Sequence, residues 1–340
     1  MAPPPEKKQK TESTDAKSSL EQLRAAGTKV VADTGDFEAI DKYHPQDSTT
    51  NPSLILAAAK KPAYKKLIDN AVEYGQNHGD TTEEKVCCAM DKLLVEFGSE
   101  ILKIVPGVVS TEVDARLSFD KERTVKKALR LIELYEEAGH SKDKVLIKIA
   151  ATWEGIQAAR ELESKHGIHC NLTLIFAFQQ AVACAEGNIT LVSPFVGRIL
   201  DYYKQKTGKT YSVEEHPGIL SVKKVYNYYK KYEYKTVIMA ASLRTLDEVD
   251  ALAGLDNMTL SLSLLDDLMN SNQTIARKLD VSKAKAEPLR KVTYIDNEPK
   301  FRYELNDNEM ATMKLSDGIR KFAADALSLE GILEERLAEE

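Results

Sequence analysis

The chain has 340 residues, of which 43% are hydrophobic and 29% charged, and its formal net charge is −6. This is an ordinary globular composition, and a chain of this length buries a large core without disulfides or metals to stabilise it. An acidic body excludes broad nucleic-acid binding, which needs a basic surface. No segment approaches the roughly 20 apolar residues of a transmembrane helix. We therefore expect neither nucleic acid nor membrane as a partner.

The first 19 residues differ in composition from the rest of the chain. They are rich in Pro, Lys and Ser and lack the apolar segment of a secretory signal. We expect a disordered tail over 1–19 and a single domain over 20–340. The basic run at 6–10 resembles a weak nuclear localisation signal, but a solvated tail is the favoured interpretation.

The four cysteines show no Cys-x-x-Cys spacing. The pattern favours reduced, buried thiols over a disulfide framework or a zinc site. We therefore expect a cytoplasmic protein, and the basic tail is the one feature that would permit a minor nuclear pool.

From Leu20 onward, short apolar runs alternate with longer amphipathic segments. Near-continuous apolar runs are typical of strands buried on both faces of a parallel sheet. Strands are expected at 29–32, 48–50, 108–113, 145–150, 170–176, 189–193, 236–241 and 258–262. Helices are expected at 52–74, 83–104, 120–138, 152–165, 245–253 and 316–337, and a polar loop at 201–218. This alternation favours an α/β fold, a single-domain (β/α)8 TIM barrel with extra helices, over a doubly wound sheet.

Lys148 is the clearest sign of chemistry, because it interrupts the apolar strand at 145–150. Side chains alternate along a strand, so Lys148 shares a face with Leu146 and Ala150. Burial disfavours an ammonium ion, and a neutral amine attacks carbonyl groups. The alternative is a lysine at the end of a strand whose stem reaches solvent. Lys103 is the comparison: it ends a helical pattern, and we expect it to face solvent.

Other polar residues lie in or directly after the predicted strands, where the active sites of barrels are found. Taken singly, each is more simply a hydrogen-bonded core residue. Together they would surround Lys148 with acids, hydroxyls and amides, which carbon–carbon bond chemistry on a polyol needs. They are Asp33, Ser110, Glu112, Asp114, Asn171, Thr173, Ser193 and Ser242.

Arg198 and Arg244 follow the sixth and seventh predicted strands. Loops after late strands bind phosphate in many barrels, and guanidinium groups match phosphate oxygens. A surface salt bridge is the alternative for each arginine.

Three further patterns are rejected. His166 and His169 beside Cys170 lack a fourth ligand at a suitable spacing, so we expect no metal. No Gly-x-Gly-x-x-Gly or Walker sequence exists, so we expect no nucleotide cofactor. The interleaved lysines and tyrosines of 222–235 fit a helix that covers the outside of the barrel better than they fit a single-strand nucleic-acid site.

Five segments in order resemble the transaldolases, most closely the eukaryotic, fungal-type form. They are VVADTGD at 30–36, TTNPSL at 49–54, STEVDAR at 110–116, IKIA at 147–150 and SPFVGR at 193–198. The resemblance runs from about Leu20 to the C-terminus. It implies a class I aldolase barrel, usually a homodimer, without metal or organic cofactor. It also implies transfer of a dihydroxyacetone unit from sedoheptulose 7-phosphate to glyceraldehyde 3-phosphate, which gives erythrose 4-phosphate and fructose 6-phosphate.

The resemblance also implies roles for particular residues. Lys148 matches the Schiff-base lysine, and Asp33 matches the acid/base that takes the proton of the donor's C4 hydroxyl. Glu112 and Thr173 match the pair that holds the catalytic water. The residues that match substrate-binding groups are Asn51, Asn171, Ser193, Phe195, Arg198, Ser242 and Arg244.

The sequence departs from the family pattern at several positions close to these motifs. They are Val108, Ala151, Ala177, Tyr202, Ala240, Leu243 and Leu262. None replaces a matched catalytic residue, so they bear on turnover more than on reaction class, and the methyl group of Ala240 is expected to lie near the phosphate clamp. Two alternatives stay open: an aldolase that releases free dihydroxyacetone from fructose 6-phosphate, and a catalytically weakened barrel that binds sugar phosphates.

Overall fold

A computed structural model describes residues 17–339 of the chain. Its eight strands pair in chain order and in parallel to form one closed barrel, so the predicted (β/α)8 architecture is confirmed. The strands are β1 (Lys29–Asp33), β2 (Asp47–Thr49), β3 (Val109–Glu112), β4 (Val145–Ala150), β5 (Cys170–Ile175), β6 (Leu191–Pro194), β7 (Val237–Ala240) and β8 (Asn257–Leu260).

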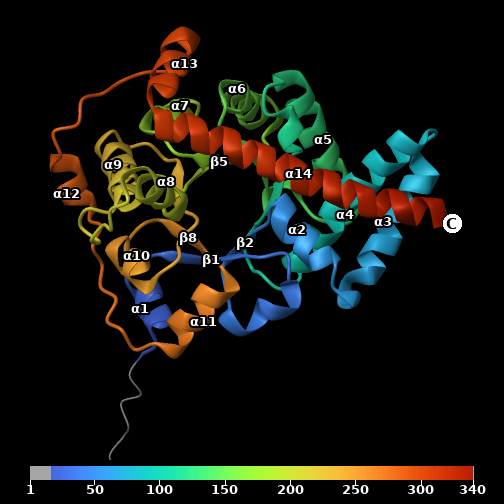
Figure 1. Ribbon diagram of the computed structural model, residues 1–340, viewed down its shortest axis with the longest axis horizontal. Helices are drawn as coiled ribbons and strands as arrows, with labels where there is room; N and C mark the ends of the chain where they lie inside the picture. The colour runs from blue at the N-terminus through green and yellow to red at the C-terminus, as the bar shows by residue number, and fades with distance from the viewer. Residues whose placement is uncertain (1–16, 340) are drawn as a thin grey trace, which may run out of the picture.

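The helices surround this barrel (Figure 1). They are α1 (Ser19–Ala25), α2 (Pro52–Ala59), α3 (Lys65–His78), α4 (Thr82–Leu102), α5 (Lys121–Glu137), α6 (Trp153–Glu161), α7 (Phe178–Glu186), α8 (Gly197–Thr207), α9 (Pro217–Lys231), α10 (Leu246–Ala251), α11 (Leu262–Asn270), α12 (Val281–Ala286), α13 (Glu298–Asp307) and α14 (Glu309–Glu339). Short helical turns are η1 (Phe37–Ala39), η2 (Asp41–Tyr43), η3 (Pro62–Tyr64), η4 (Ala115–Leu117), η5 (Lys142–Lys144) and η6 (Leu162–His166).

Two predicted segments are wrong in detail. The single helix expected at 52–74 is divided into α2 and α3, because Pro62 cannot donate a helical hydrogen bond and opens the short turn η3 instead. The polar loop expected at 201–218 is helical up to Thr207. There Gly208 adopts a left-handed φ of 67° that ends α8, which is a conformation that glycine reaches without strain.

The predicted N-terminal tail lies outside the described residues except for its last three. Of these, Ser18 caps α1 and accepts a hydrogen bond from the backbone of Glu21, and Ser19 begins the helix. Helix α1 therefore begins one residue before the predicted boundary at Leu20.

The barrel interior is layered. Its apolar layer holds Val31, Leu146, Leu191 and Met239, one each from β1, β4, β6 and β7. The polar side chains of the strands lie beyond this layer, toward the ends where the strands finish. Outside the barrel, the predicted covering role of the tyrosine-rich segment is confirmed, because Tyr226, Tyr228 and Tyr229 of α9 are buried.

The last helix, α14, crosses the molecule and packs against elements from both halves of the chain (Figure 1). It contacts α2, α4, α8 and the strand β5. Ser53 of α2 bonds to Asp325 of α14, and Arg116 of η4 pairs with Glu330. The helix thus covers the end of the barrel at which the strands finish.

The cysteines only partly match their prediction. All four are free, and Cys170 and Cys184 are buried as expected. Cys87 is exposed, because it lies on α4 facing a surface cleft. Among residues 17–339, none of the helices has the length and apolarity that a bilayer crossing requires.

Two glycines of the long helices provide a test of the packing. A Cβ at Gly98 of α4 would lie 1.7 Å from Tyr135 Oη, whereas at Gly331 of α14 it would meet nothing within 4 Å. We predict that Gly98→Ala lowers the free energy of unfolding by about 2–3 kcal/mol, because the buried tyrosine cannot yield. Gly331→Ala is predicted to raise it by up to about 1 kcal/mol through helix propensity. Urea unfolding of both variants checks this, and equal effects would contradict it.

Candidate active site

Lys148 lies inside the barrel, at the middle of β4. Its neighbour two residues earlier, Leu146, belongs to the apolar interior layer, and the alternation of the strand directs Lys148 the same way. The lysine is only 5% exposed. The predicted contrast with Lys103 is confirmed, since the Lys103 side chain is 63% exposed at the end of α4.

Two oxygen atoms hold the Lys148 amine. Its Nζ donates a hydrogen bond of 3.0 Å to the backbone carbonyl of Thr50. The same nitrogen lies 3.3 Å from Glu112 Oε2. The barrel register accounts for the second contact, because Glu112 of β3 pairs directly with Lys148 of β4.

Glu112 and Thr173 have unused hydrogen-bonding capacity at this point. Glu112 Oε2 and Thr173 Oγ1 are both buried and have no hydrogen-bond partner within the described chain. Burial raises the pKa of Glu112, and the charge of Lys148 opposes that rise. A raised pKa helps a carboxyl group to keep a proton that it can then donate, as a general acid must.

Asp33 ends β1 and faces the same space. It accepts a hydrogen bond of 2.8 Å from the Thr49 hydroxyl, which pairs with it in the sheet. Burial raises the pKa of Asp33, while Lys148 and the Thr49 hydrogen bond lower it. The carboxylate is therefore desolvated but supported, the state expected of a general base.

The predicted amide and hydroxyl residues divide into two layers. Asn51 caps α2 through its Oδ1, which accepts from the backbone of Leu54 at 3.0 Å, so its amide nitrogen remains available to a ligand. Asn171 lies deeper and is fully buried. It donates to Ser110 at 3.1 Å and accepts from Ser193 at 2.6 Å, and thereby orients Ser193.

These side chains surround one pocket, here called the substrate pocket, of about 150 Å³. It is lined by Asp33, Thr49, Asn51, Lys148, Thr173, Ser193, Phe195, Arg198, Ala241, Ser242, Thr259 and Phe322. Glu112, Asn171 and Arg244 were predicted at the site but do not appear among its lining residues; each contacts or adjoins a residue that does.

The two arginines lie close together at one side of the pocket, Arg198 in the first turn of α8 and Arg244 in the loop between β7 and α10. Arg198 stacks its guanidinium on Phe195 and Phe322, at 5.2 and 5.8 Å from the ring centres. Arg244 is half exposed and pairs with Asp201 of α8 through contacts of 2.5 and 2.6 Å. Guanidinium groups match the oxygens of phosphate, so this side of the pocket is the candidate position for an anion.

Close backbone packing joins the start of α8 to the Arg244 loop. The Gly197 N–H donates to the Ser242 carbonyl at 2.9 Å, and a Cβ at Gly197 would lie 2.4 Å from that oxygen. Ser242 itself has a φ of 59°, an unusual conformation for a residue with a side chain. Such strain persists only where the surroundings hold it, which is common at ligand sites.

A buried pair supports the Arg244 loop from behind. His216 caps α9 by accepting backbone hydrogen bonds at Nδ1, so its Nε2 donates to Glu248 at 3.0 Å. The other Glu248 oxygen accepts the backbone N–H of Arg244 at 2.7 Å. Burial opposes ionisation of Glu248, but these hydrogen bonds hold its pKa below the usual value.

Sequence reasoning missed several of these residues. Phe322 reaches the substrate pocket from α14, and no local pattern distinguishes it from the other apolar residues of that helix. Gln180 is fully buried and bonds to Ala151, Leu174, Phe176 and Ala177, which joins the ends of β4 and β5. The one sequence signal for the role of Gln180 is that a polar glutamine lies within an apolar helical segment.

Two of the departures from the family pattern, Ala177 and Tyr202, belong to the apolar cluster that includes the pocket residues Phe195, Ala241 and Phe322, and the others pack elsewhere. The expectation for Ala240 is wrong, because this residue faces the core outside the barrel, while its neighbour Ala241 faces the pocket. Ala151 and Leu243 also pack in that outer core, and Val108 lies beside the apolar interior layer. None of the seven departures is among the residues that line the pocket.

Comparison with known proteins agrees with this geometry. The family model Transaldolase/Fructose-6-phosphate aldolase matches residues 30–333. The chain is 65% identical to Transaldolase NQM1 of Saccharomyces cerevisiae over 337 residues, which cover 99% of this chain and 100% of that protein. It is 61% identical to a transaldolase of Kluyveromyces lactis, with 99% of each chain covered. It is 57% identical to the transaldolase of Sus scrofa, with 99% and 98% covered.

The Arg244–Asp201 pair leads to a prediction about anions. Asp201 occupies both terminal nitrogens of the guanidinium and repels a competing anion, although a half-exposed pair is worth only about 0–1 kcal/mol. We predict that Asp201→Asn binds inorganic phosphate about two- to fivefold more tightly in isothermal titration calorimetry. Asp267→Asn, on the exposed face of α11, is the control for the change in net charge. Unchanged or weaker binding of phosphate by Asp201→Asn would show that the Asp201 carboxylate and phosphate do not compete for Arg244.

Proposed function

Because this chain belongs to the transaldolase/fructose-6-phosphate aldolase family, we propose that it forms its Schiff base on Lys148, with Glu112, Thr173 and Asp33 as its acid–base groups. One observation carries the proposal: a lysine within a closed barrel, 3.3 Å from a buried carboxylate, opens onto a polar pocket.

The reaction class follows from the family. The chain is a transaldolase by its identity to transaldolases along nearly its whole length, and so a transferase of the Schiff-base class. The reaction moves a dihydroxyacetone unit from sedoheptulose 7-phosphate to glyceraldehyde 3-phosphate and belongs to the pentose phosphate pathway. Its substrates are therefore sugar phosphates.

The first step joins the donor to Lys148. The amine attacks the donor's carbonyl carbon, and the resulting carbinolamine loses its hydroxyl group as water to give an iminium ion. Glu112 is placed to protonate that hydroxyl, because its carboxyl lies beside the lysine nitrogen and its pKa is raised. Thr173 Oγ1, buried and without a partner among the described residues, supplies a second contact for the water.

The second step breaks a carbon–carbon bond. Asp33 takes the proton of the donor's C4 hydroxyl, the bond between C3 and C4 breaks, and its electrons move into the iminium to form an enamine. The aldehyde product leaves. An acceptor aldehyde then reacts with the enamine by the same steps in reverse, and Asp33 returns the proton.

The arginines account for the phosphate. The chain as a whole is acidic, so an anionic substrate needs a local cluster of positive charge. Arg198 at the start of α8 and Arg244 after β7, together with Ser242, would hold the phosphate end of the substrate. Asn51, Asn171, Ser193 and Phe195 would contact or orient the rest of the sugar.

We further propose a cytoplasmic homodimer, which the family resemblance implies. Four free cysteines suit a reducing compartment. Large apolar side chains that stay exposed, such as Tyr303 of α13 and Met313 of α14, are candidates for the contact between subunits. Light scattering during gel filtration measures the assembly directly.

The central prediction concerns the covalent intermediate. Reduction with borohydride in the presence of fructose 6-phosphate should attach a three-carbon unit to Lys148. Trypsin would then fail to cut there and leave residues 145–160 as one modified peptide in the mass spectrum. Lys148→Ala should show no adduct and no transfer, with an unchanged circular dichroism spectrum. An unmodified Lys148 in protein that binds the sugar would refute the mechanism and favour a sugar-phosphate-binding barrel.

An assay of the unaltered protein with and without an acceptor aldehyde distinguishes a transferase from an aldolase. Product formation that requires an acceptor aldehyde is expected of a transaldolase. Release of free dihydroxyacetone at the same rate without an acceptor would instead indicate a fructose 6-phosphate aldolase.

A second prediction concerns pH. Asp33 must be ionised to accept a proton, and the Thr49 hydrogen bond stabilises the ionised form. Thr49→Val removes that bond, so the pKa of Asp33 should rise and the acid limb of kcat/KM should move to higher pH. A hydrogen bond worth about 0.5–1.5 kcal/mol corresponds to a displacement of about 0.4–1.1 in pH.

The matched control is Thr259→Val. Thr259 contacts the Thr49 hydroxyl at 2.6 Å, whereas the hydroxyl that bonds to Asp33 in the described part of the chain is that of Thr49. The acid limb of kcat/KM in the Thr259→Val variant should stay at the pH of the unaltered protein. Displacement of the Thr49→Val profile to lower pH, or equal displacement in both variants, would contradict the assigned role of Asp33.

A further inference from the structure

A second, smaller cavity adjoins Glu112. This cavity, here called the side cavity, has a volume of about 50 Å³ and lies between α4, α5, α14 and the end of β3. Met90, Asp91 and Leu94 of α4, Lys127 of α5 and Ala326 of α14 are among its lining residues, together with Glu112 itself. Glu112 thus touches Lys148 but lines the side cavity, whereas Lys148 and Thr173 line the substrate pocket.

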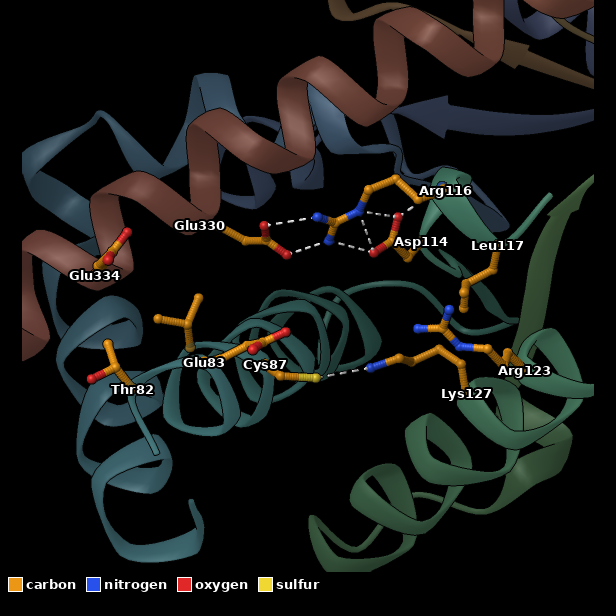
Figure 2. Close-up of a pocket in the computed structure, with 11 residues that line it drawn as sticks. Thr82, Glu83, Cys87, Asp114, Arg116, Leu117, Arg123, Lys127, Glu330 and Glu334 are labelled. Atoms are coloured by element: carbon orange, nitrogen blue, oxygen red, sulfur yellow. Dashed lines mark hydrogen bonds and ion pairs between the residues drawn. The ribbon is translucent and has the colours of Figure 1, made fainter. Parts of the chain in front are cut away.

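The side cavity adjoins the surface. An open cleft of about 650 Å³, here called the side cleft, lies between α4, α5 and α14 (Figure 2). The side cleft and the side cavity share five lining residues, Cys87, Asp114, Arg116, Lys127 and Glu330. A continuous set of side chains therefore leads from solvent to Glu112 through the flank of the barrel, apart from the substrate pocket.

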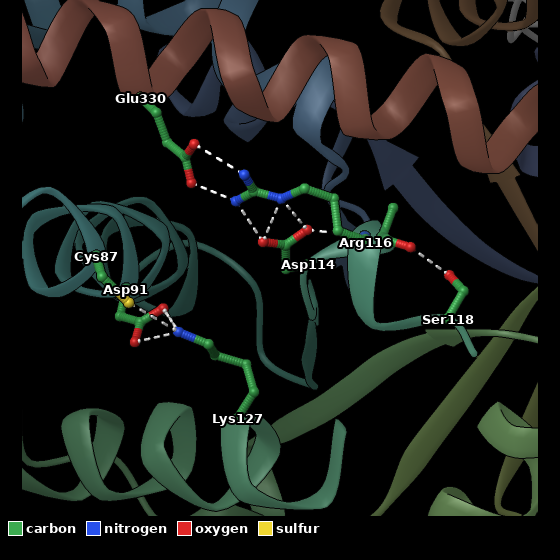
Figure 3. Close-up of polar contacts among 8 residues, drawn as sticks. Cys87, Asp91, Asp114, Arg116, Ser118, Lys127 and Glu330 are labelled. Carbon is green, nitrogen blue, oxygen red and sulfur yellow. Dashed lines mark hydrogen bonds and ion pairs between the residues drawn. The ribbon is translucent and has the colours of Figure 1, made fainter. Parts of the chain in front are cut away.

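The lining of the side cavity is mixed, with apolar side chains such as Met90 and Leu94 beside polar groups that can bind water. Lys127 Nζ lies 2.7 Å from both carboxylate oxygens of Asp91 (Figure 3). Asp91 is only 7% exposed, and a buried ion pair is often worth less than an apolar replacement. A cavity that holds water must supply polar partners, and one water needs on the order of 10–15 Å³. The Asp91–Lys127 pair meets the first condition, and the volume of the side cavity meets the second.

An ion-pair bridge lies where the side cleft meets the side cavity. Arg116 bonds to Asp114 through Nε at 2.9 and 3.0 Å, and to Glu330 of α14 through Nη1 at 3.1 Å (Figure 3). These side chains are partly exposed. The bridge therefore narrows the path at the point where the side cleft meets the side cavity, because Arg116 is held by two carboxylates at once.

The proposed reaction releases and takes up water beside Lys148, and such a path would serve this exchange. Forming the iminium breaks the carbinolamine C–O bond and releases one water. Hydrolysis takes up one water in two stages. The water oxygen bonds to the iminium carbon while Glu112 takes one of its protons, which gives the carbinolamine. Glu112 then passes that proton to the lysine nitrogen and takes the hydroxyl proton as the C–N bond breaks, so that a carbonyl group and a neutral amine remain. During both steps the sugar phosphate occupies the substrate pocket, which is the direct way from the barrel mouth to Lys148.

We propose that water reaches and leaves the Schiff base through the side cavity, with Glu112 as the group that passes it to Lys148. This inference rests on the proposed function, since it concerns the water of the same Schiff base. It assigns the Asp91–Lys127 pair a role as the polar lining of the route. The carbon–carbon steps need no water, so the route matters only for formation and hydrolysis of the Schiff base.

The test fills the side cavity without touching the catalytic groups. Ala326→Val adds two methyl groups at the cavity wall, and Ala324→Val, exposed on the same helix, is the matched control. The dihydroxyacetone adduct is prepared from fructose 6-phosphate, freed of product and mixed with erythrose 4-phosphate. The mass of the intact protein after an acid quench measures how fast the acceptor joins the adduct. Chromatography measures how fast the free seven-carbon sugar phosphate is released.

Ala326→Val should leave joining within about twofold of the control and slow release about tenfold. Leu94→Ala enlarges the side cavity and should hasten hydrolysis of the adduct in the absence of acceptor, which keeps the proposal testable if Ala326→Val does not fold. Release at the control rate, or equal slowing of joining and release, would overturn the proposal. The adduct is measured first, so its absence in the unaltered protein would overturn the proposed function itself.

Discussion

The contact between Lys148 and Glu112 determines what the rest of the site must do. An amine and a carboxyl group in the core of a barrel lose their hydration, and each is tolerated there only because the other lies 3.3 Å away. The register of β3 against β4 sets that separation, because it pairs the two residues directly. A shift by one residue would turn Lys148 toward the outer helices and remove the contact.

The arrangement around this contact follows from the layers of the barrel. The apolar layer from β1, β4, β6 and β7 closes the interior on one side of Lys148. The helix α14 covers the other side and contributes Phe322 to the substrate pocket. The amine is therefore enclosed from below by packing and from above by a helix from the end of the chain. A reactive enamine needs such an enclosure, because water would otherwise hydrolyse it before an acceptor arrives.

Local signals in the sequence predicted the barrel and half of the residues that line the pocket, whereas Asn51 and Phe195 were expected only from the resemblance to the transaldolases. Apolar runs mark strands, and a polar residue such as Lys148 or Asp33 within or after one is conspicuous. Phe322, Asp201 and the side cavity leave no such signal. Their roles depend on which distant segments meet: α14 comes from the far end of the chain, and Asp201 lies on a helix where a polar loop was expected. The sequence could not predict that Ala240 points outward either, because the apolar run of β7 does not indicate which of its residues face the pocket.

Separating water from the substrate pocket explains how one site accommodates two opposed requirements. Schiff-base formation and hydrolysis need water beside Lys148, whereas the enamine must be kept from it while the acceptor binds. If water entered through the barrel mouth, every opening to exchange aldehydes would also admit it. With Glu112 at the inner end of the side cavity, entry of water is tied to the one carboxyl group that must accept or donate the proton. Exchange of aldehydes then proceeds through the substrate pocket, and delivery of water depends on the flank of the barrel instead of its mouth.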